Sequence, residues 1–303
     1  MRVRCEAVLV VLGAAWVLAV PQVQAQDTRV SGGVSFRLTS GTFGGEQTTS
    51  ILYAPAIVRL DAGRVELVAF FPYLSVENAA GALSDGGWIP MQGAVNGAPN
   101  VGVPVGGMGG GHMGGGMMGG GTSQPSGTPL PPSTGVAVAS VSGFGDIVGS
   151  AGYRLVDNLL TGMQLVVAAR IKFPTASAPR GLGTGRTDVG AAATVRKRFG
   201  SGWLYGEVGY LVLGEPAGTD LRNALTWAAG GGRRLASRVF LLASAFGNTA
   251  VLPGYDSPAE VGAGIGVRLA ESLYFTAIPS VGLSHASPSY GVTFGVSTDL
   301  WRR

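Results

Sequence analysis

The chain of 303 residues has little charge, almost no lysine and a single cysteine. Charged residues make up 13% of it, about half the roughly 25% of an ordinary soluble domain. Its lysines are Lys172 and Lys197, and its cysteine is Cys5, close to the N-terminus. Once an N-terminal segment containing Cys5 is removed, disulfides, thiolate metal sites and a cysteine nucleophile are all excluded.

Long apolar runs are also absent beyond residue 20, although 46% of the residues are hydrophobic and the mean hydropathy is +0.33. A membrane-spanning helix needs about 18 consecutive apolar residues, so a helical membrane protein is excluded. Disorder is excluded too, because the chain is too apolar. The 52 glycines and the thinly spread apolar residues predict a transmembrane β-barrel instead.

The first 25 residues have the pattern of a signal peptide. Arg2 and Arg4 precede an apolar stretch at 7–20, and Val23-Gln24-Ala25 forms a small-x-small cleavage site. The alternative is a membrane anchor helix, for which the apolar stretch is short. We therefore expect a signal peptide at 1–25 and a mature protein of residues 26–303 in the outer membrane of a Gram-negative-type bacterium. Without the segment's two arginines and one glutamate, 19 basic and 16 acidic residues remain, and this balance predicts no nucleic-acid partner.

Hydrophobicity alternates with a period of two from residue 29 onward, as in strands with one apolar and one polar face. In Met163–Phe173, for example, every second residue is apolar, and Gln164, Arg170 and Lys172 lie between them. The fold class that we predict is all-β, a transmembrane antiparallel up-and-down β-barrel of about 12 strands. A soluble β-sandwich is the alternative, but its outward faces should carry far more Lys and Glu. We predict strands at 29–39, 48–60, 64–76, 143–155, 162–173, 187–198, 203–213, 221–233, 238–249, 259–269, 273–283 and 289–301.

The connections alternate between short turns, such as 61–63 and 200–202, and longer loops, of which 77–142 is the longest. Bacterial outer-membrane barrels show this alternation, with turns in the periplasm and loops outside. The last strand, Ser289–Val296, resembles the signal read by barrel assembly machinery, although Trp301-Arg302-Arg303 replaces the usual terminal aromatic residue. We therefore expect outer-membrane lipid and, during biogenesis, this machinery as partners.

Several motifs follow one another in order between residues 140 and 300. They are Ser142–Ile147 with Tyr153, Ile171–Ala176, Gly181–Asp188, and Gly209-Tyr210 with Gly214. Together they resemble the family named for the MetA pathway of phenol degradation, whose members are outer-membrane transporters. The resemblance implies a barrel of about 12 strands that admits small, often hydrophobic or aromatic molecules. The Gly- and Met-rich insertion departs from the family pattern.

Charged side chains of both signs fall on the predicted lumen face. Arginine rings set anion preference in pores, so these residues could select anionic or polar aromatic solutes. Alternatively, they pair across a narrow lumen and fill it, and the sequence leaves both interpretations open. The candidates are Arg154, Arg170, Lys172, Asp188, Arg196, Glu207, Arg222, Glu260 and Arg268, with Glu66, Asp146, Gln164 and Arg198 beside them.

Residues 106–121 comprise eleven Gly, four Met and one His. Thioether and imidazole ligands suit Cu(I), and the candidate ligands are Met108, His112, Met113, Met117 and Met118. The alternative is a glycine-rich outer loop in which methionine is incidental, since ordering so many glycines is costly. We expect no resident cofactor.

The pattern as a whole predicts a channel for passive diffusion of small hydrophobic or aromatic solutes. Enzymatic activity is not expected, because the only histidines, His112 and His285, lie in a glycine tract and a predicted loop. A structural or adhesive barrel without an open pore is the alternative.

The signal-peptide assignment predicts the N-terminus of the mature protein. Edman sequencing or intact mass of protein purified from outer membranes should begin at Gln26. A chain that retains Arg2 and Arg4 would identify the segment as an anchor.

Overall fold

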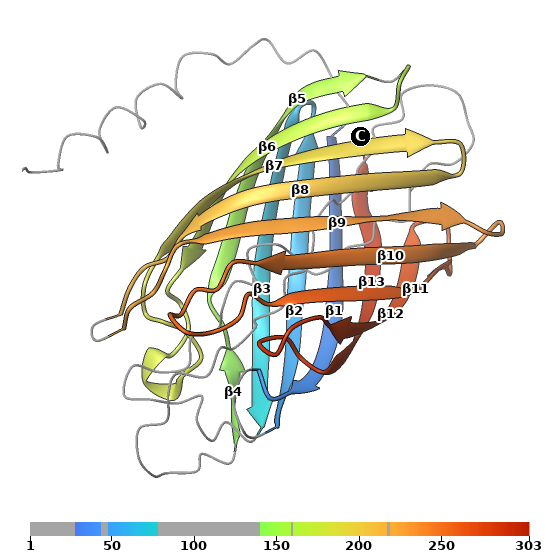
Figure 1. Ribbon diagram of the computed structural model, residues 1–303. Coiled ribbons are helices and arrows are strands. Elements are labelled where there is room, and N and C mark those ends of the chain that lie inside the picture. Colours follow the sequence, from blue (N-terminus) through green and yellow to red (C-terminus); the bar gives the residue numbers. More distant parts are fainter. Residues whose placement is uncertain (1–27, 44–47, 78–139, 159, 217–218, 303) are drawn as a thin grey trace, which may run out of the picture.

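The computed structural model describes residues 28–43, 48–77, 140–158, 160–216 and 219–302, which form one antiparallel sheet and one short 3-10 helix, η1 (Ala178–Arg180) (Figure 1). Within these ranges, no helix has the length and apolar character needed to cross a membrane. The strands are β1 (Thr28–Gly41), β2 (Thr49–Ala62), β3 (Val65–Glu77), β4 (Ser140–Phe144), β5 (Ile147–Asn158), β6 (Met163–Phe173), β7 (Asp188–Phe199), β8 (Gly202–Val212), β9 (Ala224–Arg234), β10 (Val239–Asn248), β11 (Ala259–Arg268), β12 (Leu273–Gly282) and β13 (Tyr290–Arg302).

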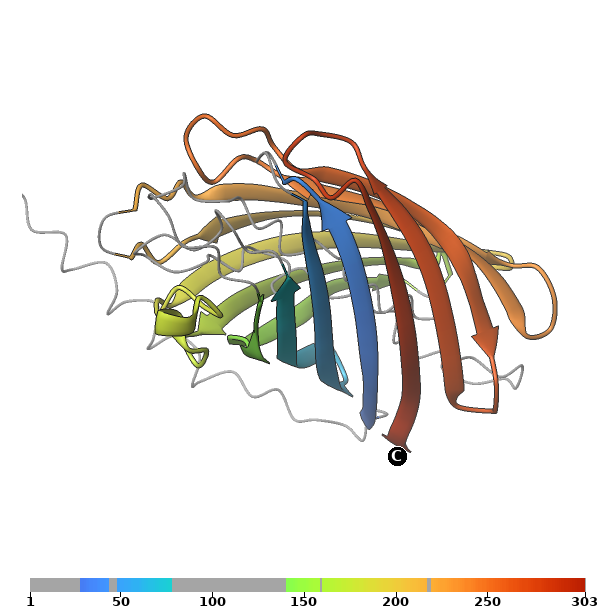
Figure 2. The same cartoon turned by 90° about the horizontal axis from the view of Figure 1, so that it is seen from below.

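The sheet closes on itself, because β1 pairs with β2 on one side and with β13 on the other. Along the seam between the first and last strands, the register runs from Arg29 opposite Arg302 to Ser40 opposite Tyr290. The other strands follow in chain order around the wall (Figure 2). The predicted antiparallel up-and-down barrel is confirmed.

One predicted strand, 143–155, is divided into β4 and β5, which both pair with β3. The chain breaks at Gly145 and Asp146, where the Gly145 N–H donates to the carbonyl of Pro72 at 2.9 Å. A β-carbon on Gly145 would lie 2.4 Å from a methyl of Leu74, so any larger residue would require Leu74 to move. Because β4 and β5 occupy successive parts of one position, the wall has the twelve positions that the alternation predicts.

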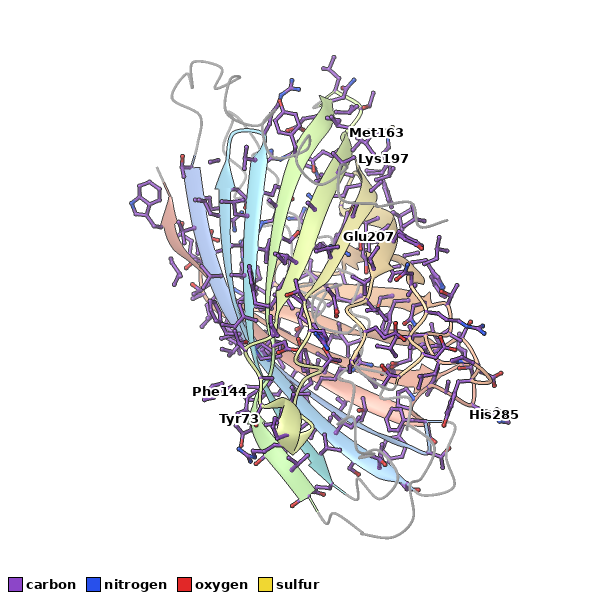
Figure 3. All side chains as sticks on the ribbon, turned by 90° about the vertical axis from the view of Figure 1, so that its left-hand side faces the viewer. Tyr73, Phe144, Met163, Lys197, Glu207 and His285 are labelled. Atoms are coloured by element: carbon purple, nitrogen blue, oxygen red, sulfur yellow. The ribbon has the colours of Figure 1, made fainter. Side chains whose placement is uncertain are left out.

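Alternate residues of each strand point into and out of the barrel. On β1, Ser35 and Arg37 are 4% exposed, whereas Phe36 and Leu38 between and beside them are 50% and 49% exposed. On the outside near the end of β3, the rings of Tyr73 and Phe144 meet edge to face with centroids 5.8 Å apart (Figure 3). Large apolar side chains on the outer surface and charged ones inside are the reverse of a soluble protein and fit a lipid-facing wall.

The two ends of the barrel differ in their connections. At the turn end, short segments join the strands at 63–64, 159–162, 200–201, 235–238 and 269–272, and the C-terminal end of β13 lies there as well (Figure 1). At the loop end lie the longer connections, among them 174–187, 213–223, 249–258 and 283–289.

The lipid-facing side of the barrel predicts that the cost of a charged substitution depends on its depth in the bilayer. Val208, 58% exposed near the middle of β8, and Val212, 42% exposed at its end, point to the same side. Val208→Arg should lower the free energy of unfolding in lipid vesicles by about 2–4 kcal/mol, and Val212→Arg by about 0–1 kcal/mol, because an arginine near the interface reaches water. Equal costs in guanidinium titrations would contradict a bilayer centred on β8.

Candidate functional site

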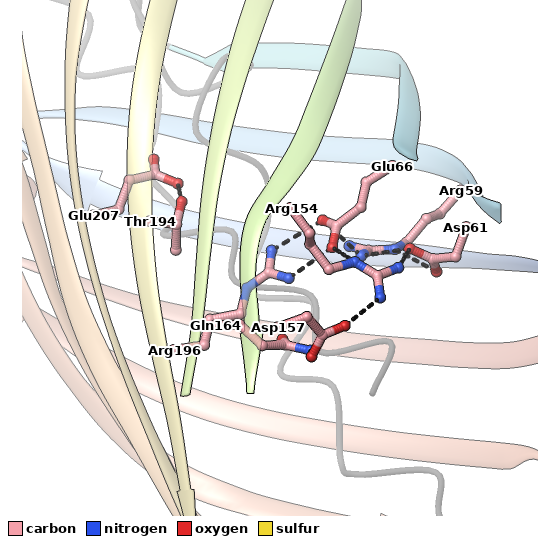
Figure 4. A network of polar contacts seen from close by, with 9 residues as sticks. All are labelled: Arg59, Asp61, Glu66, Arg154, Asp157, Gln164, Thr194, Arg196 and Glu207. Carbon is pink, nitrogen blue, oxygen red and sulfur yellow. Dashed lines mark hydrogen bonds and ion pairs between the residues drawn. The ribbon is translucent and has the colours of Figure 1, made fainter. Parts of the chain in front are cut away.

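Three arginines converge on one carboxylate on the inner face near the turn end (Figure 4). The carboxylate of Glu66 on β3 lies 2.9 Å from Nη2 of Arg59 and 3.0 Å from Nε of Arg154. It also accepts hydrogen bonds from Nη1 and Nη2 of Arg196, at 3.0 and 3.2 Å. These arginines, on β2, β5 and β7, form what we call the three-arginine cluster. Alternation explains the convergence, because every one of these residues occupies an inward position of its strand.

Further acceptors balance the charge of the cluster. Asp61 accepts two hydrogen bonds from Arg59, both at 2.8 Å, and Asp157 accepts one from Arg154 at 3.2 Å. Gln164 donates to the other Asp157 oxygen at 3.0 Å. Three guanidinium groups therefore face the three carboxylates of Glu66, Asp61 and Asp157, and the net charge of the network is zero.

A second ion pair lies halfway along the same wall. Arg170 on β6 donates to Glu207 on β8 at 2.7 Å, and the hydroxyl of Thr194 on β7 donates to the other Glu207 oxygen at 2.8 Å. The pair bridges three neighbouring strands, so its groups line the wall without crossing to the opposite side.

Lys172 anchors the connection 174–187 at the loop end. Its Nζ lies 2.9 Å from Asp188 and 3.3 Å from Asp146, and donates to the Thr184 hydroxyl at 2.9 Å. Asp146 also accepts the backbone N–H of Ala176 at 2.9 Å. These bonds draw the middle of the connection into the barrel.

An apolar cluster holds the same connection from the other side. Leu182, which is 1% exposed, packs with inward residues of β2 and β3 and with Phe43. Gly181 just before it has φ 72°, a left-handed conformation that favours glycine. A similar cluster joins Val251 and Leu252 of the connection 249–258 to Leu211 and Ala224. Two connections therefore bring buried aliphatic side chains to the loop end.

The wall from β8 to β12 is aromatic and aliphatic at the turn end. Trp203, Phe240 and Tyr274 form one buried cluster with Leu242 and Ile278. The indole of Trp203 lies against Gly232 of β9, where a β-carbon would come within 2.2 Å of the ring. The inner face therefore has two chemical sides, one with paired charges and one with large apolar rings.

A fourth group of charges links β1 to the far side of the seam. Arg37 pairs with Glu260 of β11, and its guanidinium carbon lies 5.3 Å from the centroid of the Phe246 ring on β10. Ser280 donates to Glu260 at 3.3 Å. Both charged side chains are about 5% exposed, so the pair is shielded from water.

The structure places most of the predicted lumen residues in these groups. Arg154 and Arg196 meet at Glu66, Arg170 meets Glu207, and Lys172 meets Asp188, while Glu260 pairs with Arg37. Arg268 lies on β11 at the turn end and donates to the carbonyl of Ser237 at 3.4 Å. Arg222 is exposed in the connection before β9, which begins at Ala224 and not at the predicted 221.

Arg37, Arg59 and Asp61 were not among the predicted site residues. They lie at inward positions of β1 and β2, so the same alternation could have identified them.

The remaining candidates lie elsewhere. Met108, His112, Met113, Met117 and Met118 fall outside the described residues. Among the described residues, no group of three His, Cys, Asp or Glu side chains could hold a metal ion. His285 is exposed in the connection 283–289, at the edge of the molecule in Figure 3.

By sequence, the chain matches no protein-family model and no curated relative. By structure, it is similar to an outer-membrane channel from Pseudomonas putida F1, with a TM-score of 0.57 and 12% identity over 93% of this chain and 99% of the other. It also aligns with the NanC porin (TM-score 0.47, 8% identity, 89% of this chain and 100% of the other) and with the CymD monoaromatic hydrocarbon channel (TM-score 0.41, 10% identity, 89% and 87%). At 12% identity the likeness to the Pseudomonas putida channel shows the fold, which is that of an outer-membrane β-barrel.

The buried pair of Arg37 and Glu260 predicts a stability effect. Arg37→Met should lower the free energy of unfolding by about 3–5 kcal/mol, because it leaves the Glu260 charge buried and unpaired. The double variant Arg37→Met/Glu260→Gln should recover most of this loss in denaturant titrations. Arg29→Met is the control, since Arg29 pairs with Asp299 where both side chains are more exposed, at 11% and 14%. A double variant as unstable as Arg37→Met would contradict the argument.

Proposed function

We propose that this protein is a channel of the outer membrane through which small hydrophobic or aromatic solutes diffuse passively. The observation that carries the proposal is the two-sided inner face. On one side the charges are neutralised by partners, and on the other Trp203, Phe240 and Tyr274 form a tightly packed aromatic cluster. A solute with a flat apolar body and a polar edge matches the chemistry of these two sides, and such combinations of apolar lining and a few polar groups are typical of small-molecule sites.

Charge pairing argues against a simple anion filter. Arg170, Lys172 and Arg196 each have a carboxylate partner within 3.0 Å, so these three cations of the inner face do not form a ring of unpaired charge. Of the two interpretations of the lumen charges, the structure favours pairing.

The sequence motifs support the same class of solute. The resemblance to the phenol-degradation transporters points to small aromatic molecules. The signal peptide that we predict at 1–25 points to export. The competing proposal is an adhesive barrel, in which the loop end binds a partner and no solute passes.

Single-channel recording distinguishes the two proposals. Full-length mature protein, refolded and checked by heat-modifiable gel mobility, should give stable conductance steps in planar bilayers. Measured against protein-free liposomes, the protein should also speed the entry of phenol or benzyl alcohol more than the entry of glucose. A folded barrel without conductance and without solute uptake would overturn the channel proposal.

The connection 174–187 predicts a change in conductance. Leu182→Ser should raise single-channel conductance about twofold or more, since a hydroxyl in the apolar cluster of Phe43, Ile51 and Leu74 costs free energy and loosens the connection from the wall. Pro179→Ser in the same connection, at an exposed position, should leave conductance unchanged. Equal currents from both variants would show that this connection does not restrict the passage.

A further inference from the structure

The three-arginine cluster has more hydrogen-bond donors than its acceptors can use. Glu66 lies 2.9 to 3.2 Å from four guanidinium nitrogens, yet one of them, Nε of Arg154, is buried and makes no hydrogen bond. Arg196 donates to Glu66 through Nη1 and Nη2, so its Nε takes no part in this ion pair. That Nε is buried and has no hydrogen-bond partner, in a side chain that is 5% exposed. A buried N–H without an acceptor costs free energy that an incoming acceptor would recover.

The chemistry of the cluster fixes the kind of acceptor. Guanidinium groups from β2, β5 and β7 point at one place, and planar forks of this kind bind carboxylates through paired hydrogen bonds. Glu66 is the carboxylate that occupies the place in this structure. A free carboxylate that enters the cluster has to displace Glu66, and it can accept from the Nε groups of Arg154 and Arg196, which Glu66 leaves without a hydrogen bond.

An aromatic ring lies beside the cluster. Tyr205 of β8 is directly opposite Arg196 in the register of β7 and β8, on the inward, half-buried side. Gly230 of β9 leaves room for this ring, since a β-carbon there would lie 2.8 Å from Cε1 of Tyr205. Next along β8 on the same face is Trp203 of the aromatic cluster. Cationic donors and aromatic surface therefore adjoin one another at the turn end.

We propose that the three-arginine cluster is a binding site for aromatic carboxylates, in which the solute's carboxylate bonds to Arg196 and Arg154 in competition with Glu66 and its ring packs on Tyr205. The proposal rests on the proposed function, because the channel is the route by which the solute arrives. It narrows the solute class to aromatic acids and makes Glu66 an internal competitor. Binding is noncovalent exchange of one carboxylate for another.

Direct binding to the folded, full-length mature barrel in detergent micelles tests the site without relying on transport. In equilibrium dialysis, benzoate should bind about tenfold more tightly than benzyl alcohol, which has the same ring without the charge. Arg196→Gln should abolish this preference. Arg170→Gln is the matched control, since it removes an equal charge from the same wall at the separate pair with Glu207, and it should keep the preference.

Two further variants separate binding from structural support. Glu66→Gln removes the internal competitor while keeping its shape, so benzoate should bind about tenfold more tightly than to the unchanged protein. Arg196→Lys keeps the charge but lacks Nε and the planar fork, and should weaken benzoate binding even if Arg196→Gln does not fold.

Equal binding of benzoate and benzyl alcohol would overturn the proposed site. An equal loss of the preference for benzoate in Arg196→Gln and Arg170→Gln would do the same. So would weaker benzoate binding by Glu66→Gln that folds normally. If the folded barrel binds benzoate but conducts no ions and takes up no solute, the binding-site proposal stands and the channel proposal is rejected. The failures of the two proposals are therefore distinguishable.

Discussion

The structure depends on one constraint, that no backbone N–H or C=O group can remain unpaired in hydrocarbon. A sheet satisfies it only by closing, and here closure joins β1 to β13, the first and last strands of the chain. Closure in turn fixes the two faces, because each strand then has lipid on one side and the interior on the other. Outward positions are apolar, as at Phe36 and Leu38, and the polar side chains are confined to the barrel interior.

The confinement of polar side chains to the barrel interior explains the chemistry of the inner face. Twelve strand positions enclose little space, so long side chains inside cannot each keep a shell of water. Charges there are stable when they meet opposite charges, as Lys172 does between Asp146 and Asp188. Large rings are stable when a neighbouring strand yields room, as Gly232 does for Trp203. The glycine-rich composition and the mixed charges are two responses to the same narrow interior.

Local pattern was enough to predict the wall, and not enough to predict the contacts across it. A period of two in 163–173 needs only neighbouring residues, and β6 follows it from Met163 to Phe173. The division of β4 from β5 depends on contacts with Leu74 and Pro72 of another strand. The alternation within 143–155 contains no information about these contacts. Arg37 and Glu260 are 223 positions apart, and their pairing depends on which strands flank the seam and on their tilt. Likewise, nothing in 174–187 alone indicates that Leu182 turns inward, since the cluster that receives it belongs to β2 and β3.

The seam also has a consequence for how the molecule forms. Arg29 and Asp299, bonded across β1 and β13, are 270 positions apart, so the first strand has no partner on that side until the last one arrives. Contacts of such sequence separation make folding slow, and the edge of β1 stays open to wrong pairing throughout. A partly inserted chain is therefore the most vulnerable state of this protein, and the time spent in it is set by the arrival of its C-terminal strand.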